Sequence, residues 1–142
     1  MPIRSASAQW LGNFTDGSGT VRTEKGGYSG NYSAKSRFEE GEGTNPEELV
    51  GAAHAGCFSM FLAKLLADAG TPSASIDTTA RVHLDKTEAG QTVSRIELET
   101  VAQVPGVDEA DFRNFVDNAK NNCPISRLLA PGTDISVTAR LS

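Results

Sequence analysis

Cysteine and histidine are scarce in this chain of 142 residues, which holds two of each: Cys57, Cys123, His54 and His83. No pair among the four has the chelating loop spacing of a zinc site, so we expect no metal. His83 lies among charged residues of an alternating segment and is expected at the surface. The chemistry of the chain therefore depends on two cysteines that are far apart in sequence.

Clusters of positive charge are also missing. Lysine and arginine are scattered along the chain, and the formal net charge is −5. A basic patch is the electrostatic footprint of nucleic-acid binding, and a basic run is that of binding to an anionic membrane surface. The sequence therefore indicates no nucleic acid and no membrane surface as a partner.

A long uninterrupted hydrophobic run is the third absence. The N-terminus, MPIRSASAQW, lacks the apolar region of a signal peptide. The most apolar stretch, residues 49–63, ends at Lys64, short of the roughly 18 apolar residues that span a bilayer. We therefore expect no membrane segment and a cytoplasmic location. In that compartment, paired cysteines more often serve catalysis or metal binding than structural disulfides.

The rest of the sequence is patterned as one α+β domain covering residues 1–142. Alternation and turn signals predict three N-terminal strands, two central strands joined by a turn at 85–90, and one C-terminal strand. Helical patterns lie between them. The predicted order is βββ-α-ββ-α-β, with strands at 5–10, 20–24, 32–38, 75–84, 93–104 and 134–141, helices at 45–70 and 108–122, and a helical turn at 125–129.

The helix predicted at 45–70 is the element around which the others are organised. Asn45 suits the N-cap and Glu48 the third helical position, and Thr44 with Glu47 offers the same pattern one residue earlier. Apolar residues cover nearly its whole circumference, so the helix must be buried on all sides, and we expect a second copy to complete that cover in a homodimer. Gly51 and Gly56 each weaken a helix by about 1 kcal/mol, which indicates close approach of another backbone.

Cys57 lies in the middle of this helix, where a packing role and a chemical role are both open. A thiol reacts as its thiolate and needs positive charge nearby, and the helix N-terminus is too distant to supply it. His54 shares the helix face, but a neutral imidazole helps little, and packing is its simpler role. Arg37, at the end of the third predicted strand, is the better candidate because its guanidinium is always charged and binds carboxylates bidentately.

Two glutamates in the first helical turn compete as partners of that arginine. Glu47 precedes Cys57 by ten positions, which places it about 80° around the helix and about 15 Å along it. Glu48 faces the opposite side and serves the cap. The angle favours Glu47, while the axial gap leaves open whether Arg37 bridges it or the first turn is irregular.

Cys123 follows the second predicted helix in the corner Asn-Asn-Cys-Pro, where the residue before proline is extended. Such a corner could expose its sulfur. A second thiol commonly resolves the sulfenic acid that forms on a nucleophilic cysteine. Position alone leaves core packing and function equally open for Cys123, and spacing cannot show that the two cysteines meet.

Several segments together carry a resemblance to a known family: SRFE, TNPEELVGAAHAGCFSMFLAKLL, the hairpin SIDTTARVHLDK, and NNCPISRLL. They resemble the OsmC branch of the OsmC/Ohr family of thiol-dependent hydroperoxide reductases, over essentially the full length. The resemblance implies an α+β, OsmC-like fold in which antiparallel sheets wrap around buried central helices in an intertwined homodimer. It also implies active sites at the subunit interface.

The same resemblance implies roles for four residues. Cys57 matches the peroxidatic cysteine and Cys123 the resolving one. Arg37 matches the arginine that activates the peroxidatic cysteine, and Glu47 matches the glutamate that orients this arginine. In the Ohr branch the arginine lies nearer the N-terminus, so Arg22 is the alternative.

The implied activity is a peroxidase of oxidative stress defence. It reduces organic hydroperoxides, and less efficiently hydrogen peroxide, through a Cys57 sulfenic acid and a Cys57–Cys123 disulfide. An external dithiol of the lipoyl or thioredoxin type reduces that disulfide, and no cofactor is needed. An apolar wall of Phe58, Met60 and Phe61 is consistent with an organic substrate. The alternative function is a non-enzymatic, stress-induced small-ligand-binding protein in which the disulfide is structural.

Overall fold

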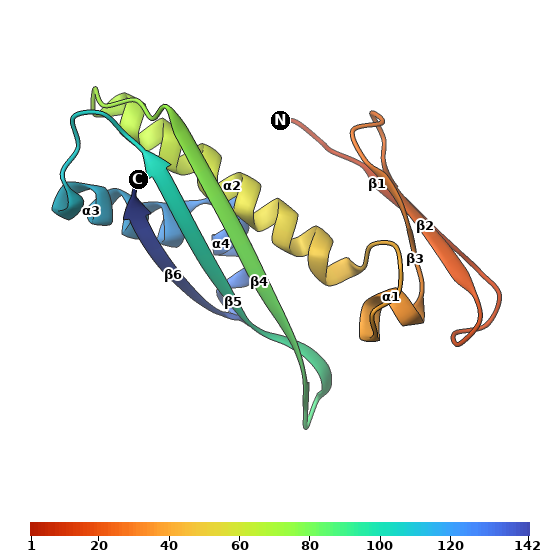
Figure 1. Ribbon diagram of the computed structural model, residues 1–142. Coiled ribbons are helices and arrows are strands. Elements are labelled where there is room, and N and C mark those ends of the chain that lie inside the picture. Colours follow the sequence, from red (N-terminus) through yellow and green to blue (C-terminus); the bar gives the residue numbers. More distant parts are fainter. The chain divides into compact units, whose positions relative to one another are not determined.

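The computed structural model describes residues 1–142, which divide into two compact units, Met1–Leu49 and Val50–Ser142. The first unit contains β1 (Ala6–Leu11), β2 (Ser18–Thr23), β3 (Ser29–Tyr32) and α1 (Ala34–Phe38), together with the first turn of α2 (Pro46–Asp68). The second unit contains the rest of α2 and the remaining elements, which are β4 (Ser75–Thr87), β5 (Gly90–Gln103), α3 (Glu109–Asn122), α4 (Pro124–Leu129) and β6 (Asp134–Leu141) (Figure 1). That residues 1–142 act as one domain stays a prediction.

The first unit is an antiparallel sheet of order β1-β2-β3 followed by a short helix. The strand predicted at 32–38 is wrong, because β3 ends at Tyr32 and residues 34–38 form α1. Ser33 and Ser36 explain the difference. The Ser33 hydroxyl accepts a hydrogen bond from the Ser36 N–H at 3.0 Å, and the Ser33 N–H donates to the Ser36 hydroxyl at 2.8 Å. This reciprocal capping box starts a helix where the alternation of side chains predicted a strand.

The start and the end of α2 are as the sequence predicts. The Asn45 side chain accepts a hydrogen bond from the Glu48 N–H at 2.8 Å and therefore caps the helix. Its amide group also donates to the Ser36 carbonyl at 3.1 Å, which ties the cap to α1. The helix ends just before Gly70, whose φ of 83° is the left-handed conformation that commonly follows a helix.

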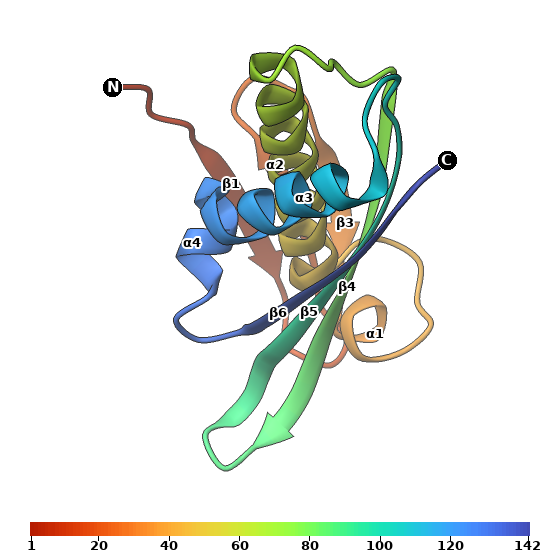
Figure 2. The ribbon, with the colours of Figure 1, turned by 90° about the vertical axis from the view of Figure 1, so that its left-hand side faces the viewer.

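The second unit has a sheet of order β4-β5-β6. β4 and β5 form the predicted hairpin, with a turn of two residues between Thr87 and Gly90 that is shorter than the turn predicted at 85–90. β6 pairs with β5 in parallel, so the sheet is mixed and the expectation of purely antiparallel sheets is wrong here. The cause is the connection through α3 and α4, which returns the chain to the starting end of β5 (Figure 2).

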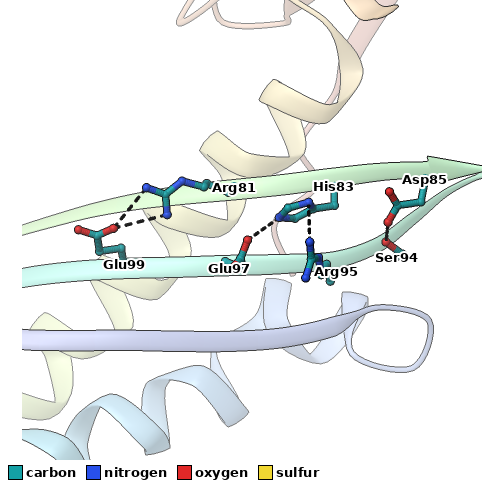
Figure 3. Close-up of polar contacts among 7 residues, drawn as sticks. All are labelled: Arg81, His83, Asp85, Ser94, Arg95, Glu97 and Glu99. Atoms are coloured by element: carbon teal, nitrogen blue, oxygen red, sulfur yellow. Dashed lines mark hydrogen bonds and ion pairs between the residues drawn. The ribbon is translucent and has the colours of Figure 1, made fainter.

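One face of the β4–β5 hairpin carries a row of polar cross-strand contacts (Figure 3). His83 is half-buried, and not fully exposed as expected for a surface residue, and its side chain hydrogen-bonds Glu97. The hydrogen bond from His83 is the main cause of the lowered pKa of Glu97. The other contacts in this row are Arg81–Glu99, Arg95–His83 and Ser94–Asp85. The opposite face of the hairpin is therefore the one available to the core.

The hydrophobic core lies in the second unit, between its sheet and its helices. α2 contributes Phe58, Leu62 and Leu66, each with no exposed surface. The other buried apolar residues are Ile96, Leu98 and Ala102 of β5, Val104 just after that strand, Phe112, Val116 and Ala119 of α3, Cys123, and Ile135 of β6. One face of α2 is thus fixed against β5 and α3.

The opposite face of α2 is exposed in the single chain, and its expected burial by a second copy stays a prediction. Ala52, Ala53 and Gly56 are exposed, and Met60 retains 76% of its accessible surface. A Cβ at Gly51 would lie 3.2 Å from the Val82 side chain, so β4 approaches closely there, whereas nothing lies within 4 Å of a Cβ at Gly56. By length and composition α2 could also cross a membrane, a test that the core helix of a soluble protein passes as well.

Candidate functional site

Cys57 and Cys123 come together in the second unit as two free thiols. Cys57 is half-buried on α2, and Cys123 has no exposed surface. This reverses the sequence-based expectation that Cys57 is the buried thiol and that the corner exposes Cys123. Cys123 ends α3 and caps α4 with extended backbone angles (φ −61°, ψ 139°), and it turns inward to join the hydrophobic core.

The protonation of Cys57 follows from this burial. Desolvation raises the pKa of the Cys57 thiol, the Ile125 backbone lowers it by hydrogen bonding, and the neighbouring Cys123 thiol raises it further. No cation is among these influences. A reactive thiolate at Cys57 therefore requires positive charge in addition to what these neighbours supply.

Arg37 and Glu47 form a bidentate ion pair in the first unit. The Arg37 Nη2 atom lies 2.7 Å from Glu47 Oε1, and Nε lies 3.2 and 3.1 Å from the two carboxylate oxygens. The Glu47 side chain is 11% exposed and that of Arg37 36%. Arg37 lies on α1 and not on the predicted strand. Its bidentate contact with the Glu47 carboxylate fixes the plane of the guanidinium group.

The two alternatives to this pair have other partners. The Glu48 carboxylate accepts a hydrogen bond from the Thr44 hydroxyl at 3.3 Å and makes no contact with Arg37. Arg22 lies on β2, is exposed, and donates to the Ser7 hydroxyl at 3.2 Å. The ion pair thus joins Arg37 with Glu47, and the roles of these residues in a reaction remain a matter for proposal.

An aromatic cavity lies beside Arg37 within the first unit. Its volume is about 290 Å³, and its lining consists of Trp10, Phe14, Tyr32, Ser33, Ala34, Arg37 and Phe38. The Arg37 guanidinium carbon is 5.4 Å from the centre of the Phe38 ring. The sequence reasoning missed this cavity because its aromatic residues are single and far apart. The apolar wall expected on α2 is different, since Phe58 is fully buried in the core and therefore closed to a ligand.

His54 and Ser126 form the second feature that the sequence reasoning missed. His54 Nε2 lies 2.7 Å from the Ser126 hydroxyl, and neither residue has more than 1% of its surface exposed. Burial lowers the pKa of His54, so its imidazole is neutral near pH 7. A specific hydrogen bond therefore holds the His54 side chain in addition to its packing. With 72 positions between the two residues, no local sequence signal could have paired them.

No three histidine, cysteine, aspartate or glutamate residues lie together in a way that could hold an ion. The candidate functional groups are the thiol pair, which lies in the second unit, and the Arg37–Glu47 pair, which lies in the first.

Comparison with known proteins places this geometry in a family. Residues 39–138 match the sequence pattern described as OsmC-like protein. The chain is 46% identical over 127 residues to the protein named peroxiredoxin OsmC of Escherichia coli strain K12, with 89% of each chain covered. It is 30% identical over 99 residues to an organic hydroperoxide resistance protein of Xanthomonas axonopodis, with 69% of this chain and 68% of that protein covered.

A solved structure supports the same assignment at the level of the fold. The organic hydroperoxide resistance protein OsmC of Legionella pneumophila superposes with a TM-score of 0.75 at 22% identity, covering 98% of each chain. The similarity of sequence and of fold extends over nearly the whole length. The chain belongs to the family of OsmC-like proteins.

Proposed function

We propose that this protein is a thiol-dependent hydroperoxide reductase that defends the cytoplasm against oxidative stress. The observation that carries the proposal is the pair of neighbouring free thiols, Cys57 and Cys123, in a chain 46% identical to a protein named peroxiredoxin OsmC. A half-buried thiol beside a fully buried one suits a nucleophile and its resolving partner.

In the first step, the Cys57 thiolate attacks the distal oxygen of the peroxide. A sulfur–oxygen bond forms, the oxygen–oxygen bond breaks, and the alkoxide leaves as an alcohol after taking up a proton. Arg37, oriented by Glu47, is proposed to supply the positive charge that holds Cys57 as a thiolate. Such a charge is needed because burial raises the pKa of Cys57.

In the second step, the Cys123 sulfur attacks the Cys57 sulfenic acid. The disulfide bond forms, the sulfur–oxygen bond breaks, and water leaves. An external dithiol, of the lipoyl or thioredoxin type, then reduces the disulfide by exchange and is itself oxidised. The cycle moves two electrons from the dithiol to the peroxide and uses no metal or organic cofactor.

The aromatic cavity beside Arg37 supports an organic hydroperoxide as the preferred substrate. A space of about 290 Å³ with Trp10, Phe14 and Phe38 in its lining accepts an apolar group, while Arg37 brings a cation to its wall. Hydrogen peroxide has no apolar group to place there. The proposal therefore predicts a higher kcat/KM for cumene hydroperoxide than for hydrogen peroxide.

We further propose that two copies of the chain form a homodimer through α2. The exposed face of this helix is apolar. In its most apolar stretch of 18 residues, only 28% is buried within the single chain. Large exposed apolar patches mark interaction surfaces in soluble proteins. A second copy would cover Met60 and the small residues beside it.

The oligomeric state tests this arrangement directly. Size-exclusion chromatography with light scattering should give twice the chain mass of 15.0 kDa. Met60→Glu should shift the equilibrium towards the monomer, while Met60→Leu, which keeps the surface apolar, should leave it unchanged. A stable wild-type monomer at micromolar concentration would refute the dimer.

Substitution of the cysteines tests the function itself. Cys57→Ser should abolish dithiol-driven turnover of tert-butyl hydroperoxide, because it removes the nucleophile. Cys123→Ser should allow one turnover and then accumulate over-oxidised Cys57, visible as added oxygen mass. Full turnover by Cys57→Ser would refute the proposal. A wild-type protein without peroxidase activity would favour the small-ligand-binding alternative.

The choice of arginine has its own test. Arg37→Met should lower the rate of peroxide reaction and raise the pKa of Cys57 in a pH titration of alkylation. Arg22→Met removes an equal charge from the exposed residue that is the alternative candidate, whose side chain hydrogen-bonds Ser7, so a larger loss in this variant would assign the role to Arg22. Equal losses in the two variants would show that net charge matters and that Arg37 has no specific role.

A further inference from the structure

Cys123, Ser126 and His54 form one continuous hydrogen-bonded chain in the second unit. The Cys123 thiol donates to the Ser126 hydroxyl at 3.1 Å, and that hydroxyl lies 2.7 Å from His54 Nε2. The Ser126 N–H also points at the Cys123 sulfur from 3.4 Å. All three side chains are at least 99% buried. No part of the peroxide-reducing steps described above uses His54 or Ser126.

The direction of hydrogen-bond donation from Cys123 towards His54 follows from the contact between Cys123 and Ser126. Because the Cys123 thiol donates to the Ser126 oxygen, the Ser126 hydroxyl hydrogen is free to be donated to His54 Nε2. His54 then carries its own hydrogen on Nδ1, a buried atom with no hydrogen-bond partner in the chain. A nitrogen lone pair thus stands at the end of a path that begins at the Cys123 sulfur.

We propose that Ser126 and His54 relay the proton of Cys123 when this thiol attacks the Cys57 sulfenic acid. The inference rests on the proposed peroxidase function and deepens it by assigning the base of the resolving step. Ser126 contacts the reacting sulfur, and His54 is a positioning residue that acts through Ser126.

The step balances as follows. The Cys123 sulfur forms a bond to the Cys57 sulfur as the Cys57 sulfur–oxygen bond breaks. The Cys123 proton moves to the Ser126 oxygen, and the Ser126 proton moves to His54 Nε2. The leaving hydroxide takes this proton back from His54 through Ser126 and becomes water, so no proton has to leave the core. Cys123 is oxidised and the Cys57 sulfur is reduced, so no outside oxidant or reductant takes part.

The burial of Cys123 explains why its proton needs a relay. Cys123 has no exposed surface, so bulk water cannot take its proton, and an apolar environment disfavours a bare thiolate. The Ser126 N–H remains to stabilise the sulfur as the proton leaves. The titratable groups beside the relay are Cys57 on α2 and Cys123 between α3 and α4, and no charged side chain influences the pKa of His54.

The test separates formation of the sulfenic acid from its resolution. The full-length protein, reduced beforehand, is mixed with one equivalent of tert-butyl hydroperoxide and quenched at intervals. A dione reagent that traps sulfenic acid and an alkylating reagent that labels free thiols allow both species to be counted by mass spectrometry. The rate of disulfide formation is measured from pH 5 to pH 9.

Ser126→Ala and His54→Gln should form the sulfenic acid at the wild-type rate and form the disulfide at least tenfold more slowly. Wild-type resolution should lose rate in acid as His54 becomes protonated, and both variants should lose this dependence. Ser59→Ala is the matched control. It removes a serine hydroxyl from α2 that hydrogen-bonds Thr78 and has no contact with the relay. Circular dichroism checks that each variant is folded.

The outcomes distinguish the relay from the function beneath it. A wild-type protein that never forms a trapped sulfenic acid overturns the peroxidase proposal itself. A normal sulfenic acid with wild-type rates of resolution in both variants overturns only the relay. Should the variants fail to fold, the wild-type rate in heavy water decides, since a rate of disulfide formation that deuterium leaves unchanged contradicts proton transfer along Ser126 and His54.

Discussion

The Arg37–Glu47 ion pair allows a quantitative prediction, because the chain contains its own control. Glu47→Gln keeps the shape of the side chain, removes its charge, and leaves one oxygen to accept from the guanidinium. Glu48→Gln removes the same charge from the same helical turn, at a residue that contacts Thr44 and not Arg37. The difference between the two variants therefore isolates the contact with Arg37.

The expected magnitude follows from burial. A hydrogen bond to a charged group contributes about 1.5–3 kcal/mol, whereas an exposed ion pair contributes about 0.2–1 kcal/mol. Glu47 is nearly buried while Arg37 is more than a third exposed, so the pair lies between these limits. Loss of a negative charge near a helix N-terminus costs about 0.3–1 kcal/mol in both variants. We expect Glu47→Gln to lose about 1.5 kcal/mol more of the free energy of unfolding than Glu48→Gln.

The assay is urea denaturation at one fixed protein concentration, because the proposed dimerisation would make stability depend on concentration. A double-mutant cycle with Arg37→Met should give a coupling energy of about 1 kcal/mol for Glu47 and none for Glu48. In the peroxidase assay, Glu47→Gln should lower the rate about tenfold if the same energy is lost from the transition state. Equal effects of the two glutamine variants, in stability and in rate, would refute this reasoning.

Three further predictions concern the second unit and the helix that enters it. Phe58→Ala should cost about 3–5 kcal/mol in urea denaturation, because the ring is fully buried among β5 and α3 residues and leaves a cavity; a cost below 1 kcal/mol would contradict this packing. Asn45→Ala should cost about 1 kcal/mol through loss of the α2 cap, whereas Asn45→Asp should retain most of it. Stability should fall as the pH drops below about 6.5, because the unfolded chain binds a proton that buried His54 refuses when folded, and His54→Gln should flatten this loss.

Local signals predicted most elements of the fold. The cap at Asn45, the turn at Gly70 and the alternation in 134–141 each depend on neighbouring residues and were read correctly. The error at 32–38 was also local in origin. Alternation favoured a strand, but Ser33 and Ser36 satisfy each other's backbone groups and start a helix instead.

The parallel pairing of β6 could have been predicted from the order of elements. A connection of two helices between β5 and β6 is long enough to return the chain to the same end of the sheet, which a hairpin cannot do. Alternation within β6 identifies the strand but carries no information on its direction. The expectation of an antiparallel sheet followed from the pattern of strands alone and overlooked this connection.

The candidate site was less accessible to sequence reasoning than the fold. Burial of Cys123 depends on how α3 and α4 pack, so the corner at Pro124 gave the wrong sense of its exposure. The pairing of Arg37 with Glu47 was predicted and is present, but Arg37 lies on α1 and not on the predicted strand. Long-range contacts such as His54–Ser126 have no signature in a single sequence.

The unequal exposure of the two thiols has a consequence for how the protein would be regenerated. In the proposed disulfide, only the Cys57 sulfur is open to an incoming thiolate, because Cys123 is sealed in the core. The reductant would therefore form its mixed disulfide with Cys57 and expel Cys123 as the leaving group. The buried thiol would thus never be joined to another molecule, which also protects it from glutathione and other small thiols.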